Sequence, residues 1–255
     1  MESTVKALLA SGKGILAADE SFPTIEKRFK AFDISSTEEN RRAYREMLFA
    51  TRGLSEFISG VILFDETIRQ RTKDGAPIPE VLTKHDIIPG IKVDKGTIAL
   101  ANCAGEKITQ GLDGLRERLV EYRELGARFT KWRAVIVIGG QIPTRACIET
   151  NADALALFAA LSQEAGLVPI VEPEVLMDGN HTLARCEEVT RATLKTVFAA
   201  LYDHRVVLEQ MLLKTGMVLS GADCPEQADV AIVAETTLRC LRRTVPAAVD
   251  RKSVV

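Results

Sequence analysis

Residues 129–138 read FTKWRAVIVI, and residues 167–174 read LVPIVEPE. Both runs are short and largely apolar, and each carries two charges that are two positions apart: Lys131 and Arg133 in the first run, Glu172 and Glu174 in the second. Side chains two positions apart in a strand lie on the same face of a sheet. Each run therefore predicts a buried strand that presents a pair of charges on one face.

Four more segments of this type surround these two. They are GILAAD (14–19), GVILFD (60–65), PGIKVD (89–94) and VVLEQMLLK (206–214). Amphipathic patterns over 37–51, 112–126, 150–166, 182–204 and 225–243 predict helices, of which two end at glycines 126 and 166. Strands that alternate with helices in this order are typical of an α/β fold with a parallel sheet.

The spacing of the strands predicts a barrel. The first and sixth strands start at positions 14 and 206, so five units occupy 192 residues, or about 38 residues each. A closed eight-unit barrel at this spacing needs on the order of 300 residues, and the chain has 255. We therefore expect a (β/α)8 TIM barrel that is incomplete here, with about six of eight strand–helix units in a single domain over 1–249.

Composition excludes several classes of protein. The 33 Lys and Arg residues nearly balance the 35 Asp and Glu residues, which argues against nucleic acid or a membrane surface as a partner. The five cysteines form no CxxC pair, and the three histidines lack the spacing of metal motifs. Without a long apolar run in the sequence, we expect a cytoplasmic protein that uses no metal or cofactor.

Charged residues lie at or near the carboxyl ends of five predicted strands, where barrel enzymes place their catalytic groups, and Lys131 and Arg133 lie together within the strand over 129–138. The predicted cluster contains the cations Lys92, Lys131, Arg133 and Lys214 and the acids Asp19, Glu172 and Glu174. Burying such charges is costly unless they are paired or functional. A network of ion pairs that merely closes one end of the barrel is therefore an equally good interpretation of the pattern.

The functional interpretation is a lysine that attacks a ketone. Only the neutral amine attacks, and neighbouring cations favour that form. A carboxylic acid at position 172 or 174 would protonate the departing hydroxyl, and Asp19 would accept a proton when the adjacent C–C bond breaks. The surrounding cations would also favour a phosphorylated substrate.

Ordered motifs along the chain resemble the class I fructose-1,6-bisphosphate aldolases of animal type. They are GKGILAADES, TEENRRAYRE, GVILFDET, GIKVDKG, TQGLDGL, FTKWRAV, GLVPIVEPE, LLK and LRRTVP. The resemblance implies a (β/α)8 barrel, catalysis without metal, sugar phosphates as ligands, a cytosolic location and, for the full-length parent, a homotetramer. The implied reaction is reversible cleavage of fructose 1,6-bisphosphate to glyceraldehyde 3-phosphate and dihydroxyacetone phosphate in glycolysis and gluconeogenesis.

The resemblance also implies roles for individual residues. Lys214 matches the Schiff-base lysine, Glu172 the acid/base of imine formation, and Asp19 the aspartate of the cleavage step. The implied substrate-binding and charge-tuning residues are Lys92, Lys131, Arg133, Glu174, Arg28 and Thr24. A transaldolase would require a different lysine context. A non-catalytic protein that binds sugar phosphates on the same scaffold is the alternative function.

The chain departs from the family pattern at three places. Residues 215–218 read TGMV where the family has PNMV, and residues 22–25 read FPTI where it has TG(S/T)I. After LRRTVP the family continues with two more strands that carry phosphate-binding loops. We therefore expect a C-terminally truncated chain with little activity of its own, in which residues 250–255, DRKSVV, are a non-native tail.

Overall fold

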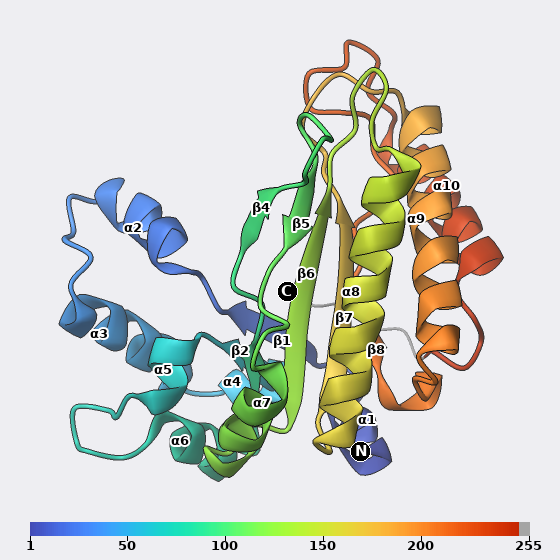
Figure 1. Cartoon of the computed structure of the whole chain (residues 1–255). Coiled ribbons are helices and arrows are strands. Elements are labelled where there is room, and N and C mark those ends of the chain that lie inside the picture. Colours follow the sequence, from blue (N-terminus) through green and yellow to red (C-terminus); the bar gives the residue numbers. More distant parts are fainter. Residues whose placement is uncertain (250–255) are drawn as a thin grey trace.

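The computed structural model describes residues 1–249, so the predicted tail at 250–255 lies outside the described residues. Six parallel strands form one curled sheet in the order β1-β2-β3-β6-β7-β8 (Figure 1). Their bounds are β1 Gly14–Ala18, β2 Ile58–Leu63, β3 Ile88–Lys92, β6 Phe129–Ile136, β7 Val168–Val175 and β8 Leu212–Leu213. The predicted α/β architecture, a barrel-like sheet of six strands, is confirmed.

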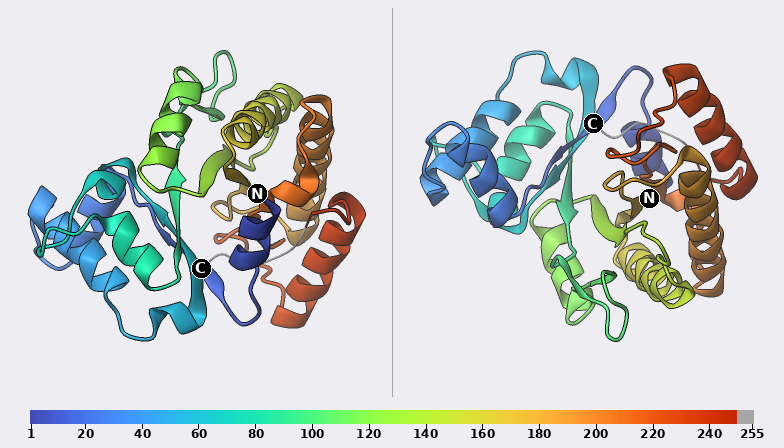
Figure 2. Two further views of the ribbon diagram at one scale, coloured as in Figure 1. Left: turned by 90° about the horizontal axis from the view of Figure 1, so that it is seen from below. Right: turned by 90° about the horizontal axis from the view of Figure 1, so that it is seen from above.

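Most of the helices lie on the outer face of this curled sheet (Figures 1 and 2). The helices are α1 Glu2–Leu8, α2 Phe22–Lys30, α3 Glu38–Phe49, α4 Leu54–Phe57, α5 Asp65–Arg69, α6 Ile78–Lys84, α7 Leu115–Glu124, α8 Arg145–Glu164, α9 Leu183–Asp203 and α10 Val230–Thr244. Helix α8 packs on β6 and β7, α9 packs on β7 and α8, and α10 packs on α9.

The inner face of the sheet begins with an apolar floor at the amino ends of the strands. This floor contains Ile15, Ile62, Phe129, Val168, Ile170 and Leu212, and Val5 and Leu8 of α1 pack against it. The Phe129 ring lies over Gly90, where a Cβ atom would be only 2.3 Å from it. An apolar floor excludes water from beneath the charged side chains that follow along the same strands.

The outer face carries the larger core, between the strands and the helices. Trp132 shows how the alternation works, because it lies between Lys131 and Arg133 in β6 but points to the opposite side. Its indole is fully buried and stacks on Phe158 of α8, with ring centroids 5.6 Å apart. This outward direction follows from the alternation of side chains along a strand.

Several elements differ from the sequence predictions. The sixth strand, predicted over 206–214, is a 3-10 turn at Leu208–Gln210 followed by the two-residue strand β8. Helix α8 begins five residues earlier than predicted, because Thr144 caps it by accepting a hydrogen bond from the Cys147 N–H. A hairpin of β4 (Thr97–Ala99) and β5 (Lys107–Thr109) follows β3 and was not predicted.

Candidate active site

The strands deliver their charged side chains in a layer directly above the apolar floor. In β6, Phe129 belongs to the floor and is followed on the same face by Lys131 and then Arg133. In β7, Ile170 is followed in the same way by Glu172 and Glu174. The parallel register places Arg133 directly beside Glu172. The period of two that was visible in the sequence therefore brings four charges to neighbouring positions.

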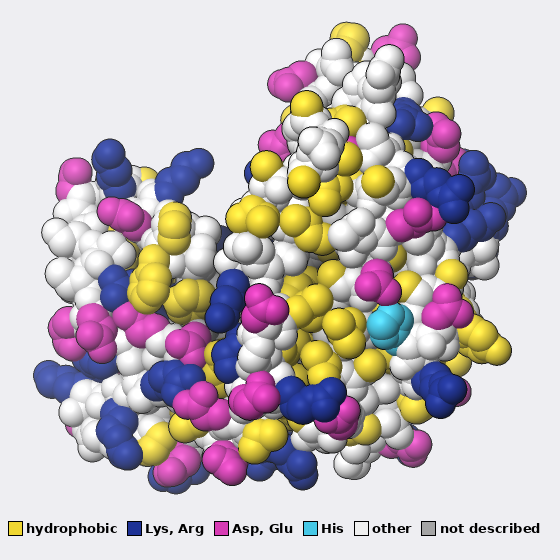
Figure 3. Space-filling view, in the orientation of Figure 1, with side chains coloured by type: hydrophobic (Ala, Val, Ile, Leu, Met, Phe, Trp, Pro, Cys, Tyr) yellow, Lys and Arg dark blue, Asp and Glu magenta, His cyan; other side chains and the backbone are white. Residues whose placement is uncertain are grey.

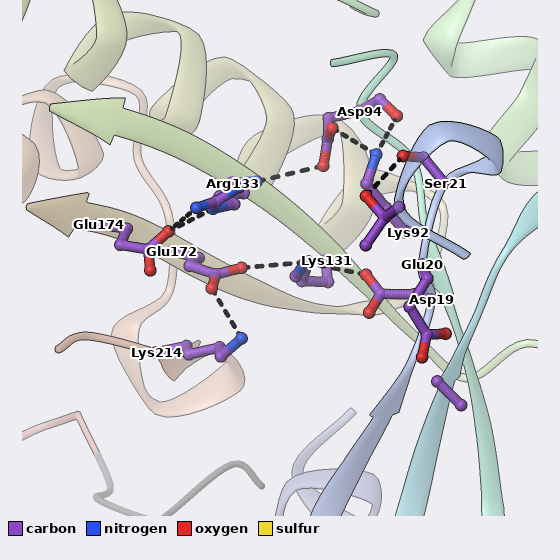
Figure 4. Close-up of polar contacts among 12 residues, drawn as sticks. Asp19, Glu20, Ser21, Lys92, Asp94, Lys131, Arg133, Glu172, Glu174 and Lys214 are labelled. Carbon is purple, nitrogen blue, oxygen red and sulfur yellow. Dashed lines mark hydrogen bonds and ion pairs between the residues drawn. The ribbon is translucent and has the colours of Figure 1, made fainter. Parts of the chain in front are cut away.

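Lys131 and Glu172 form a continuous chain of ion pairs with Lys214 and Asp19 (Figure 4). Lys214 Nζ lies 2.7 Å from Glu172 Oε1. The other oxygen of that carboxylate, Oε2, lies 3.1 Å from Lys131 Nζ, which is also 2.8 Å from Asp19 Oδ2. The Lys131 ammonium thus bridges the two carboxylates to which the sequence assigned proton transfer.

The two lysines of this chain differ in burial and in pairing. The Lys131 side chain is 6% exposed and pairs with two carboxylates, whereas the Lys214 side chain is 26% exposed and pairs with one. Burial alone would lower the pKa of Lys131, but the charges of Asp19 and Glu172 outweigh it and raise that pKa above its ordinary value. Lys131 is therefore a fixed cation, and Lys214 is the accessible amine.

A second group of charges lies along the cleft from this chain. Arg133 pairs with Glu174, and Lys92 Nζ lies 2.5 Å from Asp94 Oδ1. Asp94 also accepts hydrogen bonds from the backbone N–H groups of Gly96 and Arg133, at 3.2 Å and 3.3 Å. Asp94 ends the predicted strand over 89–94 but was not among the predicted site residues. Its spacing of two from Lys92 is the signal that could have identified it.

Every cation that the sequence placed in the cluster has a carboxylate partner in the structure. Lys92, Lys131, Arg133 and Lys214 each pair with at least one of the carboxylates Asp19, Asp94, Glu172 and Glu174. The physical reason is that a buried charge without a partner is strongly destabilising. Lys214 therefore has a proton acceptor, Glu172, as its nearest charged neighbour.

Arg28 and Thr24 come to the site from α2, which projects from the end of β1 (Figure 1). The Arg28 guanidinium pairs with Glu20, and its side chain is 59% exposed. The Thr24 hydroxyl lies 3.2 Å from that of Ser21. The unusual Phe22 packs edge-on against Phe64 and under the Arg41 guanidinium, so the altered FPTI segment still forms a regular helix.

All nine residues that the sequence singled out line one cleft of about 850 Å³. The hairpin residues Gly96 and Thr97 line its far side, opposite α2. Figure 3 shows the hollow between these two parts of the surface. A cleft of this size accommodates a phosphorylated sugar of six carbons.

Two properties of the described residues bear on cofactors and membranes. Within residues 1–249, His, Cys, Asp and Glu side chains nowhere gather in threes with the geometry of a metal site. None of the helices described is both long enough and apolar enough to cross a lipid bilayer.

Comparisons with known proteins agree with this geometry. The family model for fructose-bisphosphate aldolase class-I, the glycolytic enzyme, matches residues 1–253. A "Probable fructose-bisphosphate aldolase class 1" of Xylella fastidiosa is 60% identical over 247 residues, which are 97% of this chain and 74% of that protein. A relative from Arabidopsis thaliana, named "Fructose-bisphosphate aldolase 5, cytosolic", is 52% identical over 246 residues, which are 96% of this chain and 68% of that protein.

A solved structure extends the agreement to three dimensions. Fructose-bisphosphate aldolase from Plasmodium falciparum, in a complex with TRAP and a small-molecule inhibitor, superposes with a TM-score of 0.95 at 49% sequence identity. The match covers 97% of this chain and 72% of that one. From the family model, the identities and the shared fold together, the chain belongs to the class-I fructose-bisphosphate aldolase family.

Proposed function

We propose that Lys214 forms a Schiff base with the ketone of fructose 1,6-bisphosphate and that Glu172 and Asp19 move the protons of the reaction. The family is one of aldolases, which are carbon–carbon lyases. The observation that carries the proposal is the 2.7 Å contact between Lys214 Nζ and Glu172 Oε1. It gives an accessible amine a carboxylate that can take its proton and later return one.

The reaction begins when the Glu172 carboxylate accepts a proton from the Lys214 ammonium. The neutral Lys214 amine adds to C2 of the sugar, and the carbinolamine loses its hydroxyl as water after Glu172 protonates it. The protonated imine that remains attracts electrons. Asp19 then takes the proton of the C4 hydroxyl and the C3–C4 bond breaks. Carbons 4 to 6 leave as glyceraldehyde 3-phosphate, and the electron pair of the broken bond forms an enamine. Protonation at C3 and hydrolysis of the imine release dihydroxyacetone phosphate.

The contacts of the lysines support Lys214 as the nucleophile. Lys131 lies between two carboxylates that hold its charge, and Lys92 is held by the Asp94 carboxylate and backbone carbonyl. Lys214 has one carboxylate partner, and its backbone N–H donates to Val171 O at 2.9 Å, which fixes it beside β7. In this arrangement Lys131 holds the Glu172 and Asp19 carboxylates in place, and Arg133, Lys92, Arg28 and Thr24 bind the phosphorylated substrate.

Borohydride trapping tests the nucleophile directly. Dihydroxyacetone phosphate is added with borohydride, which reduces any imine to a stable secondary amine, and the peptides are then mapped by mass spectrometry. We expect the adduct on Lys214 and no adduct in Lys214→Met, while Lys195→Met, an exposed lysine of α9, retains it. An adduct on Lys131 or Lys92 in the unmodified protein would refute the assignment.

A coupled lyase assay on the same preparation separates catalysis from binding alone. Cleavage of fructose 1,6-bisphosphate supports the full cycle. Saturable binding without imine formation would instead support the non-catalytic sugar-phosphate-binding protein. The low turnover expected of a chain of this length remains a prediction, which the same assay measures.

The location of the protein and its oligomeric state are also proposals. We infer a cytoplasmic location, in keeping with the Arabidopsis relatives named as cytosolic. The homotetramer implied by the resemblance can be checked by light scattering coupled to size-exclusion chromatography.

A further inference from the structure

We propose that Arg45 is a positioning residue that fixes the segment carrying Asp19, and through it the geometry of the cleavage step. The inference rests on the proposed function for the role of Asp19. Arg45 belongs to α3 and does not line the cleft. Its guanidinium contacts the backbone on both sides of Asp19, which no other side chain is seen to do within residues 1–249.

The contacts of Arg45 form a bracket around one residue. Its Nη1 atom donates to the carbonyl oxygen of Ala18, the residue before Asp19. Its Nη2 atom donates to the carbonyl oxygen of Glu20, the residue after Asp19, at 3.2 Å. The same Nη2 atom lies 2.8 Å from the Glu20 carboxylate. A single planar group thus donates hydrogen bonds to two carbonyls and forms an ion pair with one carboxylate in the short segment around Asp19.

The segment needs such support because the sheet ends just before it. Strand β1 ends at Ala18, which is paired with Leu63, and α2 begins only at Phe22. In the described part of the chain, β1 pairs with β2 alone, so no second strand holds its other side. Asp19 therefore projects into the cleft from a backbone that the sheet itself does not fix.

Alternation along the chain explains how one arginine can act on the cleft from outside it. Asp19 contacts Lys131 in the cleft (Figure 4), whereas the Glu20 carboxylate pairs with Arg45 of α3. Arg45 is 2% exposed, and a buried guanidinium is costly to keep. Burial lowers the pKa of Arg45, an effect that the Glu20 charge opposes, yet arginine remains a cation at any working pH.

The chemistry of the bracket requires arginine rather than lysine. The guanidinium offers five N–H donors in a rigid plane, so it can bind two carbonyls and a carboxylate at once. An ammonium at position 45 keeps the charge but cannot span both carbonyls in one geometry. Arg45→Lys therefore removes the bracket while it retains an ion pair with Glu20, and it is the variant of choice.

The matched control is Arg41→Lys, one turn earlier in α3. Arg41 also pairs with a glutamate through two contacts, at 2.8 Å and 2.5 Å to Glu66, and its side chain is 15% exposed. Its remaining hydrogen bonds go to the backbone carbonyl and the hydroxyl of Ser36 and not to the backbone around Asp19. A general loss of stability through an arginine–glutamate pair would affect both variants alike.

Cleavage and imine formation are then measured separately in the 255-residue chain. We expect Arg45→Lys to slow single-turnover cleavage of fructose 1,6-bisphosphate roughly 10- to 100-fold. Borohydride trapping of dihydroxyacetone phosphate on Lys214 should stay within about twofold, since that step uses Glu172. Arg41→Lys should change neither quantity. Equal slowing in Arg45→Lys and Arg41→Lys would overturn the proposal.

A double-variant comparison distinguishes positioning from a structural role. With Asp19→Asn already present, adding Arg45→Lys should slow cleavage no further, because no aspartate remains to be positioned. Losses that multiply would contradict the proposal.

The proposal can also be tested if the unmodified chain neither traps nor cleaves, a result that would defeat the proposed function alone. Crystal structures of Arg45→Lys and Arg41→Lys then show whether Arg45 positions Asp19. The 2.8 Å contact between Asp19 Oδ2 and Lys131 Nζ should be lost in Arg45→Lys and kept in Arg41→Lys. Retention of the contact in both variants would overturn the bracket.

Discussion

Lys131 gives the active-site layer its stability at the scale of single residues. It is buried between Asp19 and Glu172, two carboxylates that are themselves buried. A carboxylate left in such a place without its cation is costly because water cannot reach it. The residue that stabilises the site is therefore distinct from the residue proposed to react.

Removing this cation should destabilise the fold strongly. We expect Lys131→Met to lower the free energy of unfolding by about 3–5 kcal/mol, measured by urea denaturation with circular dichroism. Lys195→Met, on the exposed face of α9, is the control and should change it by less than about 0.5 kcal/mol. Similar losses in the two variants would show that Lys131 is not essential to the balance of charges.

The Cys147 thiol provides a pH-dependent test. Burial, and after it the charge of Glu106, raises the pKa of this thiol from 9.0 to about 12. At pH 8 we therefore expect iodoacetamide to modify the part-exposed Cys103 while leaving Cys147 in the folded protein intact.

The same shift has a definite sign for stability. Between pH 9 and 12 the unfolded chain loses the Cys147 proton and the folded chain keeps it, so stability falls as pH rises through that range. If iodoacetamide modified Cys147 as fast as Cys103 at pH 8, the burial that raises the pKa of the Cys147 thiol would be contradicted.

At the scale of elements, the site depends on how closely β3 and β6 approach. The Phe129 ring of β6 occupies the space where Gly90 of β3 has no side chain. Gly90→Ala should therefore cost about 1–3 kcal/mol in thermal or urea unfolding, since the ring must move.

Two further variants check the cause of that cost. Phe129→Leu added to Gly90→Ala should recover part of the stability, whereas Gly140→Ala, where a Cβ meets nothing within 4 Å, should be close to neutral. Absence of any recovery in the double variant would place the strain elsewhere.

Predictability from sequence varied between elements for physical reasons. Strands β6 and β7 were readable because a buried strand with charges on one face has a strict period of two. The stretch at 206–214 was too apolar to show that only two residues pair, since the 3-10 turn before them has no periodic signature. The β4–β5 hairpin was missed because its strands are three residues each and mostly exposed.

The candidate site was easier to predict than these elements. Lys214, Glu172 and Asp19 stood at strand ends, and parallel strands bring such ends together. Asp94 was missed although its spacing of two from Lys92 was visible in the sequence. Arg45 was not found because its partners lie on another element. The bracket formed by Arg45 joins residues 25 and 27 positions apart, a relation that local patterns do not show.

At the scale of the whole molecule, the sheet has a protected centre and two less protected margins. Strands β6 and β7 are paired on both sides, while β1 and β8, within residues 1–249, pair on one side. Backbone groups paired on one side only are open to exchange with solvent.

Hydrogen exchange should reveal this gradient. In mass spectrometry of exchanged peptides, we expect the segments 129–136 and 168–175 to be the slowest and the segments 14–18 and 212–213 to be faster. Arg45→Lys should accelerate exchange in the peptide that contains Asp19 more than in the β6 peptide. Uniform protection of all six strands would show that the margins are covered in solution.

The outward direction of Trp132 has a practical consequence for studying this protein. It is the only tryptophan of the chain, and it sits in a dry environment on the reverse of the strand that carries the reactive layer. The chain thus contains a natural fluorophore whose emission should shift to longer wavelength when α8 separates from the sheet. Since the sheet shields it from the cleft, unfolding can be followed optically even while the cleft is occupied by a ligand.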